Sequence, residues 1–516
     1  MLSDLRKPYR PQYALLVLAL LITQAHTQAQ SRVITQTASR HDLQRLRRLE
    51  SQFQQMRQLL KIPGMSVAIV KDDRILWAKG FGYADIQKRI PATPRTVYYI
   101  ASLTKTFATT VLMQLVEEGK LDLDDPMSKY SDEFKDDSVK VKHVLSHTAD
   151  APPGERFRYD GARFATLTAV IEKKTSKSFR DVMTEMFLDP LEMRDSIPSR
   201  DTFEVAAKNP ALYDKDKLRR YQLSLARYAK PYRLYGDEII FTSYPWAGIS
   251  AAAGLLTTAP DLAKFLIAID QHVYIRPETQ ARSWTPFVSN SGKTLPHGLG
   301  WFAQDYQGVR SIWHFGYDPF EYSGTIVKVP DKGLSLVLLA NSDALSSPFV
   351  RRGILHTSPF VASFLRLFVF EDRLGRALPD PNWGKNKEDF ERELAEFKQS
   401  GYSYEGEQRA ATLIRVWINE NQRSALKAVA MNPETFDAYV GEYELPGGGV
   451  LIVSREGNHL MVQQKGESKI EMFAESSTKF FTKAVDAEFA FAKDRDGKVI
   501  HMELYQGGTL ILKKIK

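Results

Sequence analysis

Residues 98–107 read YYIASLTKTF, and this stretch predicts the start of a helix. Ser102 and Lys105 are three residues apart, so on a helix their side chains are neighbours on one face. A serine hydroxyl is a weak nucleophile until a neighbouring base takes its proton, and a deprotonated lysine is such a base. The pair alone is weak evidence, because Ser-x-x-Lys also occurs by chance on solvated helix faces. Its meaning depends on what the rest of the chain supplies.

The composition describes an ordinary globular protein of more than one domain. The chain has 516 residues, of which 43% are hydrophobic and 26% charged. The net charge is +8, but lysines and arginines alternate with acids throughout, which argues against a nucleic-acid partner. Cysteine is absent, which excludes disulfides, thiolate metal sites and cysteine nucleophiles and leaves only histidines and carboxylates for a metal. We expect neither a metal nor a cofactor.

Residues 1–29 predict an export signal. Arg6, Lys7 and Arg10 precede an apolar run at 14–22 that is too short to cross a bilayer comfortably, and small residues at 27–29 offer a cleavage site. An uncleaved anchor is the alternative. No second apolar run is long enough to span a membrane. After cleavage we expect no membrane span and a periplasmic or extracellular location.

The segments around the nucleophile predict a strand before it and a buried helix behind it. Residues 31–60 have apolar side chains at helical spacing, and 65–70 and 75–78 form a hairpin about a polar turn. The helix that follows Ser102 is expected to end at Gly119. Burial against this core would lower the pKa of Lys105 and make its neutral form available.

Later segments predict more of the same domain. Residues 164–171 predict a buried helix, with Tyr159 on the loop that leads to it. Residues 251–262 predict a small-residue strand and turn that serve packing, with Thr257 or Thr258 capping the next helix. Residues 311–316, 324–329 and 334–341 predict consecutive antiparallel strands.

The composition and residue pattern of the chain change after residue 371. Residues 372–431 have helical patterns at 386–398 and 410–429 and predict a helical connector. Residues 432–516 contain short strands separated by glycines and predict a small all-β module, either a sandwich or a barrel.

Five segments in order resemble the penicillin-recognising serine hydrolases, which include class C β-lactamases, D-stereospecific peptidases and carboxylesterases. They are the Ser-x-x-Lys pair, VLSHT at 144–148, PGERFRY at 153–159, DPLEM at 189–193 and HFG at 314–316. The resemblance implies an α+β fold, with an antiparallel sheet flanked by helices and a helical domain, over residues 30–371. The tail at 432–516 resembles a lipocalin-like module attached to some of these hydrolases, which would limit access to the site or mediate assembly.

The resemblance also implies roles for particular residues. Ser102 would be the acylated nucleophile, and Lys105 and Tyr159 would share the general-base duty, with the nearby cation lowering the pKa of the phenol. The oxyanion would lie between the backbone N–H groups of Ser102 and Tyr317. His314 would orient the substrate, charged or neutral according to pH, and Gly316 would leave space for it.

Four features depart from the family pattern or have no place in the mechanism. His147 has no catalytic task and is interpreted as structural. Where many relatives have Tyr-x-Asn, this chain has Tyr159-Asp160-Gly161, so an amide that would bind a substrate amide is missing. The short stretch before Tyr159 and the bulky Tyr317 would reshape the site. An ester loses less than a β-lactam or peptide when that donor is absent.

The sequence therefore predicts an exported serine hydrolase that acts on small esters, amides or D-amino-acid peptides. One alternative is a β-lactamase or penicillin-binding DD-peptidase. A second is a catalytically silent protein of the same fold that binds peptidoglycan or a partner. Self-assembly through the C-terminal module is a further expectation.

Overall fold

The structure is a computed structural model. It describes residues 32–34, 38–208, 213–306, 308–347, 353, 355, 358–370, 426–446, 448–465, 467–485, 487–506 and 508–516. The predicted export signal and most of the predicted helical connector lie outside the described residues. Within the described part of the chain, no helix combines the length and the apolar character that a membrane crossing requires.

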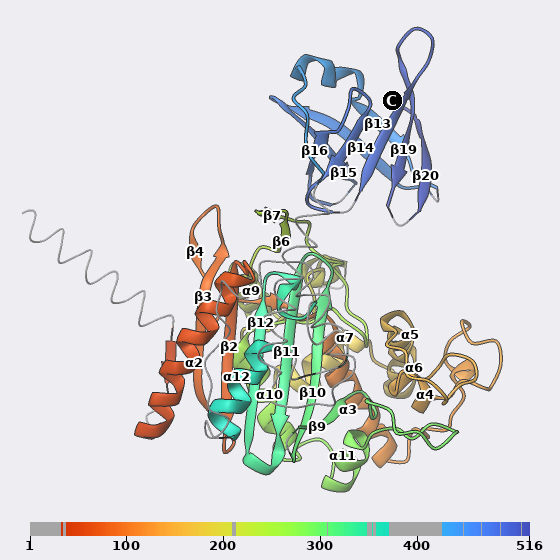
Figure 1. Cartoon of the computed structure of the whole chain (residues 1–516). Coiled ribbons are helices and arrows are strands. Elements are labelled where there is room, and N and C mark those ends of the chain that lie inside the picture. Colours follow the sequence, from red (N-terminus) through yellow and green to blue (C-terminus); the bar gives the residue numbers. More distant parts are fainter. Residues whose placement is uncertain are drawn as a thin grey trace, which may run out of the picture.

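An eight-stranded sheet is the centre of the first domain (Figure 1). Its order is β1-β3-β2-β12-β11-β10-β9, with β4 paired to β3, and every described pairing is antiparallel. The strands are β1 (Arg32–Ile34), β2 (Gly64–Lys71), β3 (Arg74–Asp85), β4 (Ile90–Pro91), β9 (Phe302–Tyr306), β10 (Val309–Asp318), β11 (Tyr322–Val329) and β12 (Leu334–Ala340). The predicted hairpin and the three predicted consecutive strands are confirmed.

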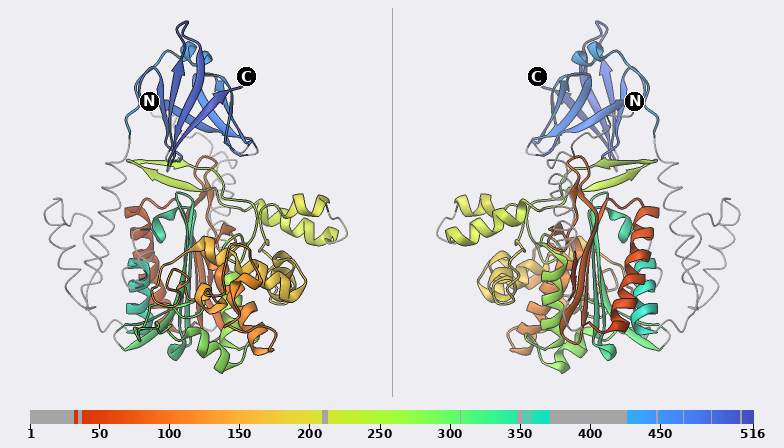
Figure 2. Two further views of the ribbon diagram at one scale, coloured as in Figure 1. Left: turned by 90° about the vertical axis from the view of Figure 1, so that its right-hand side faces the viewer. Right: turned by 90° about the vertical axis from the view of Figure 1, so that its left-hand side faces the viewer.

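The central strands are buried on both faces because helices cover both faces (Figure 2). Every residue of β11 and β12 is buried. One face is covered by α2 (Arg40–Leu59) and α12 (Pro359–Phe364), whose Phe53 and Phe360 rings meet edge to face at 5.4 Å. Ser39 caps α2 by accepting the backbone N–H of Asp42 at 3.0 Å, so the predicted amphipathic helix is confirmed.

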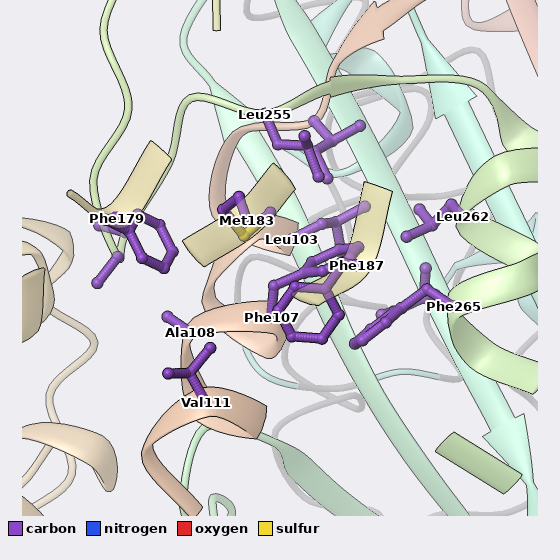
Figure 3. Close-up of a cluster of buried hydrophobic side chains, with 14 of the residues drawn as sticks. Leu103, Phe107, Ala108, Val111, Phe179, Met183, Phe187, Leu255, Leu262 and Phe265 are labelled. Atoms are coloured by element: carbon purple, nitrogen blue, oxygen red, sulfur yellow. The ribbon is translucent and has the colours of Figure 1, made fainter. Parts of the chain in front are cut away.

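The other face carries α3 (Thr104–Glu117), the helix that follows the predicted nucleophile, and α10 (Ala259–Asp270). Figure 3 shows side chains of α3 packed between those of α7, the turn that follows α7, and α10. The ring of Phe107 stacks on Phe265 at 3.8 Å and meets Phe187 edge to face at 5.2 Å. Such aromatic contacts add to the free energy of area burial and hold α3 rigidly on the sheet. Gly119, at φ +69°, follows the helix as predicted.

Smaller elements surround this core. The remaining helices are α4 (Val141–Leu145), α5 (Gly161–Ala165), α6 (Leu167–Thr175), α7 (Phe179–Met183), α8 (Thr202–Lys208), α9 (Lys215–Leu225) and α11 (Pro277–Trp284). Two short pairs, β5 (Tyr98–Tyr99) with β8 (Leu256–Thr257) and β6 (Tyr232–Tyr235) with β7 (Glu238–Phe241), complete the domain. Thr258 caps α10 through the N–H of Asp261, as one of the two predicted caps.

The C-terminal module is a closed antiparallel barrel of eight strands, the barrel alternative of the prediction. Buried and exposed side chains alternate along its strands, as in His459–Gln464, so each strand lines the core with every second residue. The barrel interior is filled by its own aromatic and aliphatic side chains. The strands are β13 (Gly441–Glu444), β14 (Val450–Glu456), β15 (His459–Gln464), β16 (Ile470–Ala474), β17 (Lys479–Thr482), β18 (Glu488–Lys493), β19 (Val499–Tyr505) and β20 (Thr509–Lys514).

The barrel contacts the first domain at the β6–β7 hairpin (Figure 1). The rings of Tyr235 and Phe481 stack at 6.4 Å, and Lys483 Nζ lies 2.7 Å from a carboxylate oxygen of Glu238. The Tyr235 hydroxyl also accepts the backbone N–H of Leu426 at 2.8 Å. Both the barrel and the segment that leads to it are therefore tied to one hairpin of the hydrolase-like domain.

Candidate active site

Ser102 lies on a single 3₁₀ turn, Ala101–Leu103, between β5 and α3. The helix proper begins two residues later than the sequence predicts. Ala101, directly before the serine, has φ +46°, a left-handed conformation that costs a residue with a side chain on the order of 1–3 kcal/mol. The buried core under α3 compensates for this strain. The result is a sharp turn that leaves Ser102 partly exposed in a buried surround.

Lys105 is fully buried beneath Ser102, and its Nζ lies 2.8 Å from Ser102 Oγ. The same nitrogen lies 3.0 Å from the carbonyl oxygen of Ala252, an interaction that the sequence did not predict. The rings of Tyr159 and Phe164 flank it at 5.2 and 5.3 Å. Burial lowers the pKa of Lys105 to about 7, although the carboxylate of Asp160 opposes this shift. In a large fraction of the molecules, Lys105 is therefore a neutral base at physiological pH.

Tyr159 lies on the loop that leads to α5, as predicted, and closes the site above Lys105. Its ring stacks on His147 at 4.3 Å and lies 5.1 Å from the ring of Phe315. Its hydroxyl is buried near Ser102 without a hydrogen bond of good geometry. Burial raises the pKa of Tyr159 well above its usual value, and the Ser102 hydroxyl offsets only part of this. The prediction that the neighbouring cation lowers this pKa is wrong, because the phenol is desolvated and the rise this causes outweighs the opposing interaction with Ser102.

His147 holds the Tyr159 loop in place. Its Nδ1 accepts the backbone N–H of Asp160 at 3.1 Å, and its carbonyl oxygen accepts the backbone N–H of Arg158 at 2.8 Å. Burial lowers its pKa well below 6.5, so the ring is neutral. These bonds flank Tyr159 on both sides, which agrees with the structural interpretation of His147.

His314 lies on β10 and is fully buried, with Nδ1 2.8 Å from the carbonyl oxygen of Phe315. Burial and two nearby groups, His297 and Lys105, lower its pKa well below 6.5. The predicted change of charge near neutral pH is therefore wrong: His314 is neutral. His297, which the sequence analysis missed, is also fully buried, and its ring centre lies 5.0 Å from that of His147 and 6.1 Å from that of His314. No spacing pattern distinguishes His297, since it lies on a loop remote from the other segments of the site.

Gly316 and Tyr317 lie on the part of β10 that extends beyond its pairing with β9. β9 pairs with β10 only as far as Trp313, so within the described residues no strand lies beside this edge from His314 onward. A Cβ on Gly316 would lie 2.3 Å from the carbonyl oxygen of Ile100, just before the Ser102 turn. Only glycine permits this approach, so the edge of β10 and the Ser102 turn face each other closely.

Gly161 faces Lys105. A Cβ on this residue would lie 3.8 Å from Lys105 Nζ, at ordinary contact distance. The position of the missing asparagine therefore lies beside Lys105. Among the described residues, no group of three or more histidines and carboxylates is arranged to hold a metal ion.

Comparisons with known proteins identify the family. The family model described as Beta-lactamase matches residues 49–356, which include every residue of the site. The chain belongs to the β-lactamase family. As a member of the β-lactamase and penicillin-binding-protein group it carries the serine-hydrolase fold, and a second family model, a domain of unknown function (DUF3471), matches residues 425–514 over the barrel.

Two curated relatives of this β-lactamase-family chain are informative. It is 22% identical to penicillin-binding protein 4* of Bacillus subtilis over 474 residues, which cover 84% of the chain and 91% of that protein. It is 25% identical to protein flp of Staphylococcus aureus (strain MW2) over 355 residues, or 59% of this chain, and spans only 64% of that relative. A solved structure, an octameric penicillin-binding protein homologue from Pyrococcus abyssi, has a TM-score of 0.52 and 22% identity and covers 90% of this chain and 99% of its own. At this identity the likeness concerns the fold.

Proposed function

We propose that the protein is an exported serine hydrolase that forms an acyl-enzyme on Ser102 and acts on small esters, amides or D-amino-acid peptides. The observation that carries the proposal is the 2.8 Å separation of Ser102 Oγ and a fully buried lysine amine without an ion-pair partner among the described residues. A solvated lysine keeps its proton at neutral pH, whereas desolvation favours the neutral amine. The pair therefore has both the geometry and the protonation state of a nucleophile with its base.

The first half-reaction follows from this geometry. Neutral Lys105 accepts the hydroxyl proton of Ser102 as Oγ bonds to the substrate carbonyl carbon. The negative charge on the carbonyl oxygen would be stabilised by the backbone N–H groups of Ser102 and Tyr317. The bond to the leaving group then breaks, and the leaving group takes a proton.

Tyr159 is the residue placed to pass that proton. Its raised pKa keeps it a phenol, so it acts as a proton donor and relay rather than as a standing phenolate. In the second half-reaction a water attacks the acyl carbon, its proton passes back through Lys105 and Tyr159, and Ser102 is released with its own proton. The rings of His147 and His314 contact that of Tyr159, His297 contacts both of these histidines, and all three are neutral and add no charge to the relay.

Gly161 supports a preference for esters. An asparagine at this position would place its amide beside Lys105, where a substrate amide could bond to it. Glycine supplies no such donor, so peptides and β-lactams gain less binding energy here than they would from the family pattern. Efficient β-lactamase or DD-peptidase activity is thus the second candidate, and silent binding is the third.

A substrate panel tests these candidates. We expect hydrolysis of p-nitrophenyl acetate that disappears in Ser102→Ala, with slower turnover of a chromogenic cephalosporin and of a D-Ala-D-Ala peptide. Gly161→Asn should raise cephalosporin turnover relative to ester turnover. Fast cephalosporin turnover by the wild type would refute the ester preference. Equal ester hydrolysis by the wild type and Ser102→Ala would refute the proposal that the protein is a serine hydrolase.

Self-assembly through the barrel is part of the same proposal. The barrel exposes large apolar side chains on its last two strands and at its C-terminus, namely Ile500, Tyr505, Leu510, Ile511 and Ile515. Exposed apolar groups that cluster on one surface favour association. Light scattering should give a mass above that of one chain, and Ile511→Lys should reduce it; a monomer in both cases would contradict the proposal.

A further inference from the structure

A second group of polar side chains lies beside the nucleophile on the same strand. Side chains alternate along a strand, so His314, Gly316 and Asp318 of β10 point to one face. Gly316 approaches the backbone of Ile100, so this is the face on which Ser102 lies. Asp318 comes two residues later, roughly 6.6 Å further along the strand. A substrate whose carbonyl lies at Ser102 would reach Asp318 with a group only a few bonds away.

Glu321 lies beside Asp318 across the tight turn that joins β10 to β11. Its backbone N–H donates to the Asp318 carbonyl oxygen at 3.2 Å. The residue is only 9% exposed, and its Oε1 accepts a hydrogen bond from Ser243 at 3.3 Å. Its Oε2 is buried with no hydrogen-bond partner among the described residues. Buried polar atoms normally have a hydrogen-bond partner, so this carboxyl oxygen is available to bind a donor group of a ligand.

Tyr99 supplies an independent indication of a ligand. Its side chain is 5% exposed, its ring lies 6.1 Å from that of Tyr322, and its hydroxyl makes no hydrogen bond to a described residue. Burial raises the pKa of this phenol, and the charges of Asp318 and Glu321 raise it further, so the hydroxyl is near both carboxylates. The buried acceptor of Glu321 and the Tyr99 hydroxyl thus lie in the same neighbourhood, and Tyr99 is three residues before Ser102.

The nearby cation Arg200 forms no ion pair with these two acids. Arg200 is near enough to lower the pKa of Glu321, but it donates to the Pro245 carbonyl oxygen at 3.0 Å and lies over the ring of Tyr244. It forms no ion pair with a described acid. Burial raises the pKa of Asp318 and Glu321, and repulsion from neighbouring acids adds to the shift: Asp343 acts on Asp318, and Asp318 and the barrel's Glu467 act on Glu321. The raised pKa favours the protonated form of Glu321 in the free protein, so the negative charge of the site lies mainly on Asp318, and a cation bound beside the two acids would favour loss of the Glu321 proton.

The position of Tyr159 decides which half of the substrate extends toward these acids. Tyr159 donates the proton to the leaving group, and its ring lies 6.1 Å from that of His314 and 5.1 Å from that of Phe315. The leaving group therefore departs at that end of the open β10 edge. The acyl half extends in the opposite direction, past Tyr317 toward Asp318.

We propose that Asp318, Glu321 and Tyr99 form a subsite for the ammonium group of the acyl half, so that the preferred substrates are aminoacyl esters or amides with a free amine. A primary ammonium carries three donors, which matches the acceptor oxygens of two carboxyl groups and a hydroxyl, with Asp318 as the charged partner. This inference rests on the proposed acyl-enzyme chemistry at Ser102. It adds to that chemistry the identity of the group bound beside it.

A matched pair of substrates tests the inference: methyl D-alaninate and methyl D-lactate, which differ only by an amine in place of a hydroxyl. At pH 7 we expect kcat/KM at least about tenfold higher for the amine, because charge-assisted hydrogen bonds are roughly twice as strong as neutral ones. In Asp318→Asn and Glu321→Gln the ratio of the two values should fall to within about twofold. Both replacements are nearly isosteric, and thermal melting checks that each variant is folded.

Asp305→Asn is the control, since it removes the same charge at the far end of the β9–β10 pair, where Asp305 bonds to Arg310. It should keep the wild-type ratio. Equal rates for the two esters in the wild type, or a preference that survives in both subsite variants, would overturn the subsite and leave the hydrolase intact. Failure of the hydrolase proposal looks different: neither ester would be hydrolysed faster than by Ser102→Ala.

Discussion

The pH dependence of acylation follows directly from the burial of Lys105. Only the neutral amine can accept the Ser102 proton, and burial lowers the pKa of Lys105 to about 7. The neutral fraction is then about 9% at pH 6 and about 91% at pH 8, so the acylation rate should rise about tenfold over this interval and then level off. An unperturbed lysine, with a pKa of about 10.4, would give a rate that still rises about tenfold per pH unit through pH 9.

The assay is the second-order rate of labelling by a fluorophosphonate, measured from pH 5.5 to 9.5, since this rate reports the free enzyme. Asp160→Asn should move the midpoint to lower pH, because the Asp160 carboxylate raises the pKa of Lys105 and asparagine still caps α5. Lys105→Arg should abolish labelling, since arginine stays protonated. Lys88→Arg, on an exposed turn, is the control and should keep the wild-type profile. A wild-type rate that rises steadily beyond pH 8.5 would refute a neutral Lys105 as the base.

Two further predictions concern other parts of the site. Tyr159→Phe should lower kcat about 10²- to 10³-fold with the pH midpoint of labelling unchanged, because it removes the proton relay but not the base; a shifted midpoint in stopped-flow labelling would instead make Tyr159 the base. Gly316→Ala should abolish ester hydrolysis and lower the melting temperature, because its Cβ would lie 2.3 Å from the Ile100 carbonyl oxygen. Gly508→Ala, with open space around its Cβ, should change neither, and an active Gly316→Ala would contradict the close approach of β10 to the nucleophile.

Much of the fold could be predicted because periodicity in this chain follows burial. The two apolar segments about a polar turn at 65–78, the strand-like segments at 324–341 and the helical spacing at 43–53 each gave an element of the right type. The barrel was predicted only as one of two all-β architectures, since closure depends on β13 pairing with β20. The sequences of short strands do not show whether the first strand of the module pairs with the last one.

The sequence indicated which residues would lie close together but not their electrostatics. Ser102, Lys105 and Tyr159 come together as the ordered segments indicated, whereas the direction of the Tyr159 pKa shift was wrong. That direction depends on how deeply the phenol is buried and on whether its lysine neighbour carries charge, and neither is written in local spacing. Local spacing also gave no indication of His297 or the Ala252 carbonyl group, because both reach the site from loops distant in sequence.

The central claim is that Ser102 is the nucleophile, and intact-protein and peptide mass spectrometry after treatment with a fluorophosphonate tests it most directly. We predict one adduct per chain, carried by the peptide that contains Ser102 and absent from Ser102→Ala and from Lys105→Arg. Folded wild-type protein without an adduct, or an adduct that persists in Ser102→Ala, would contradict the account.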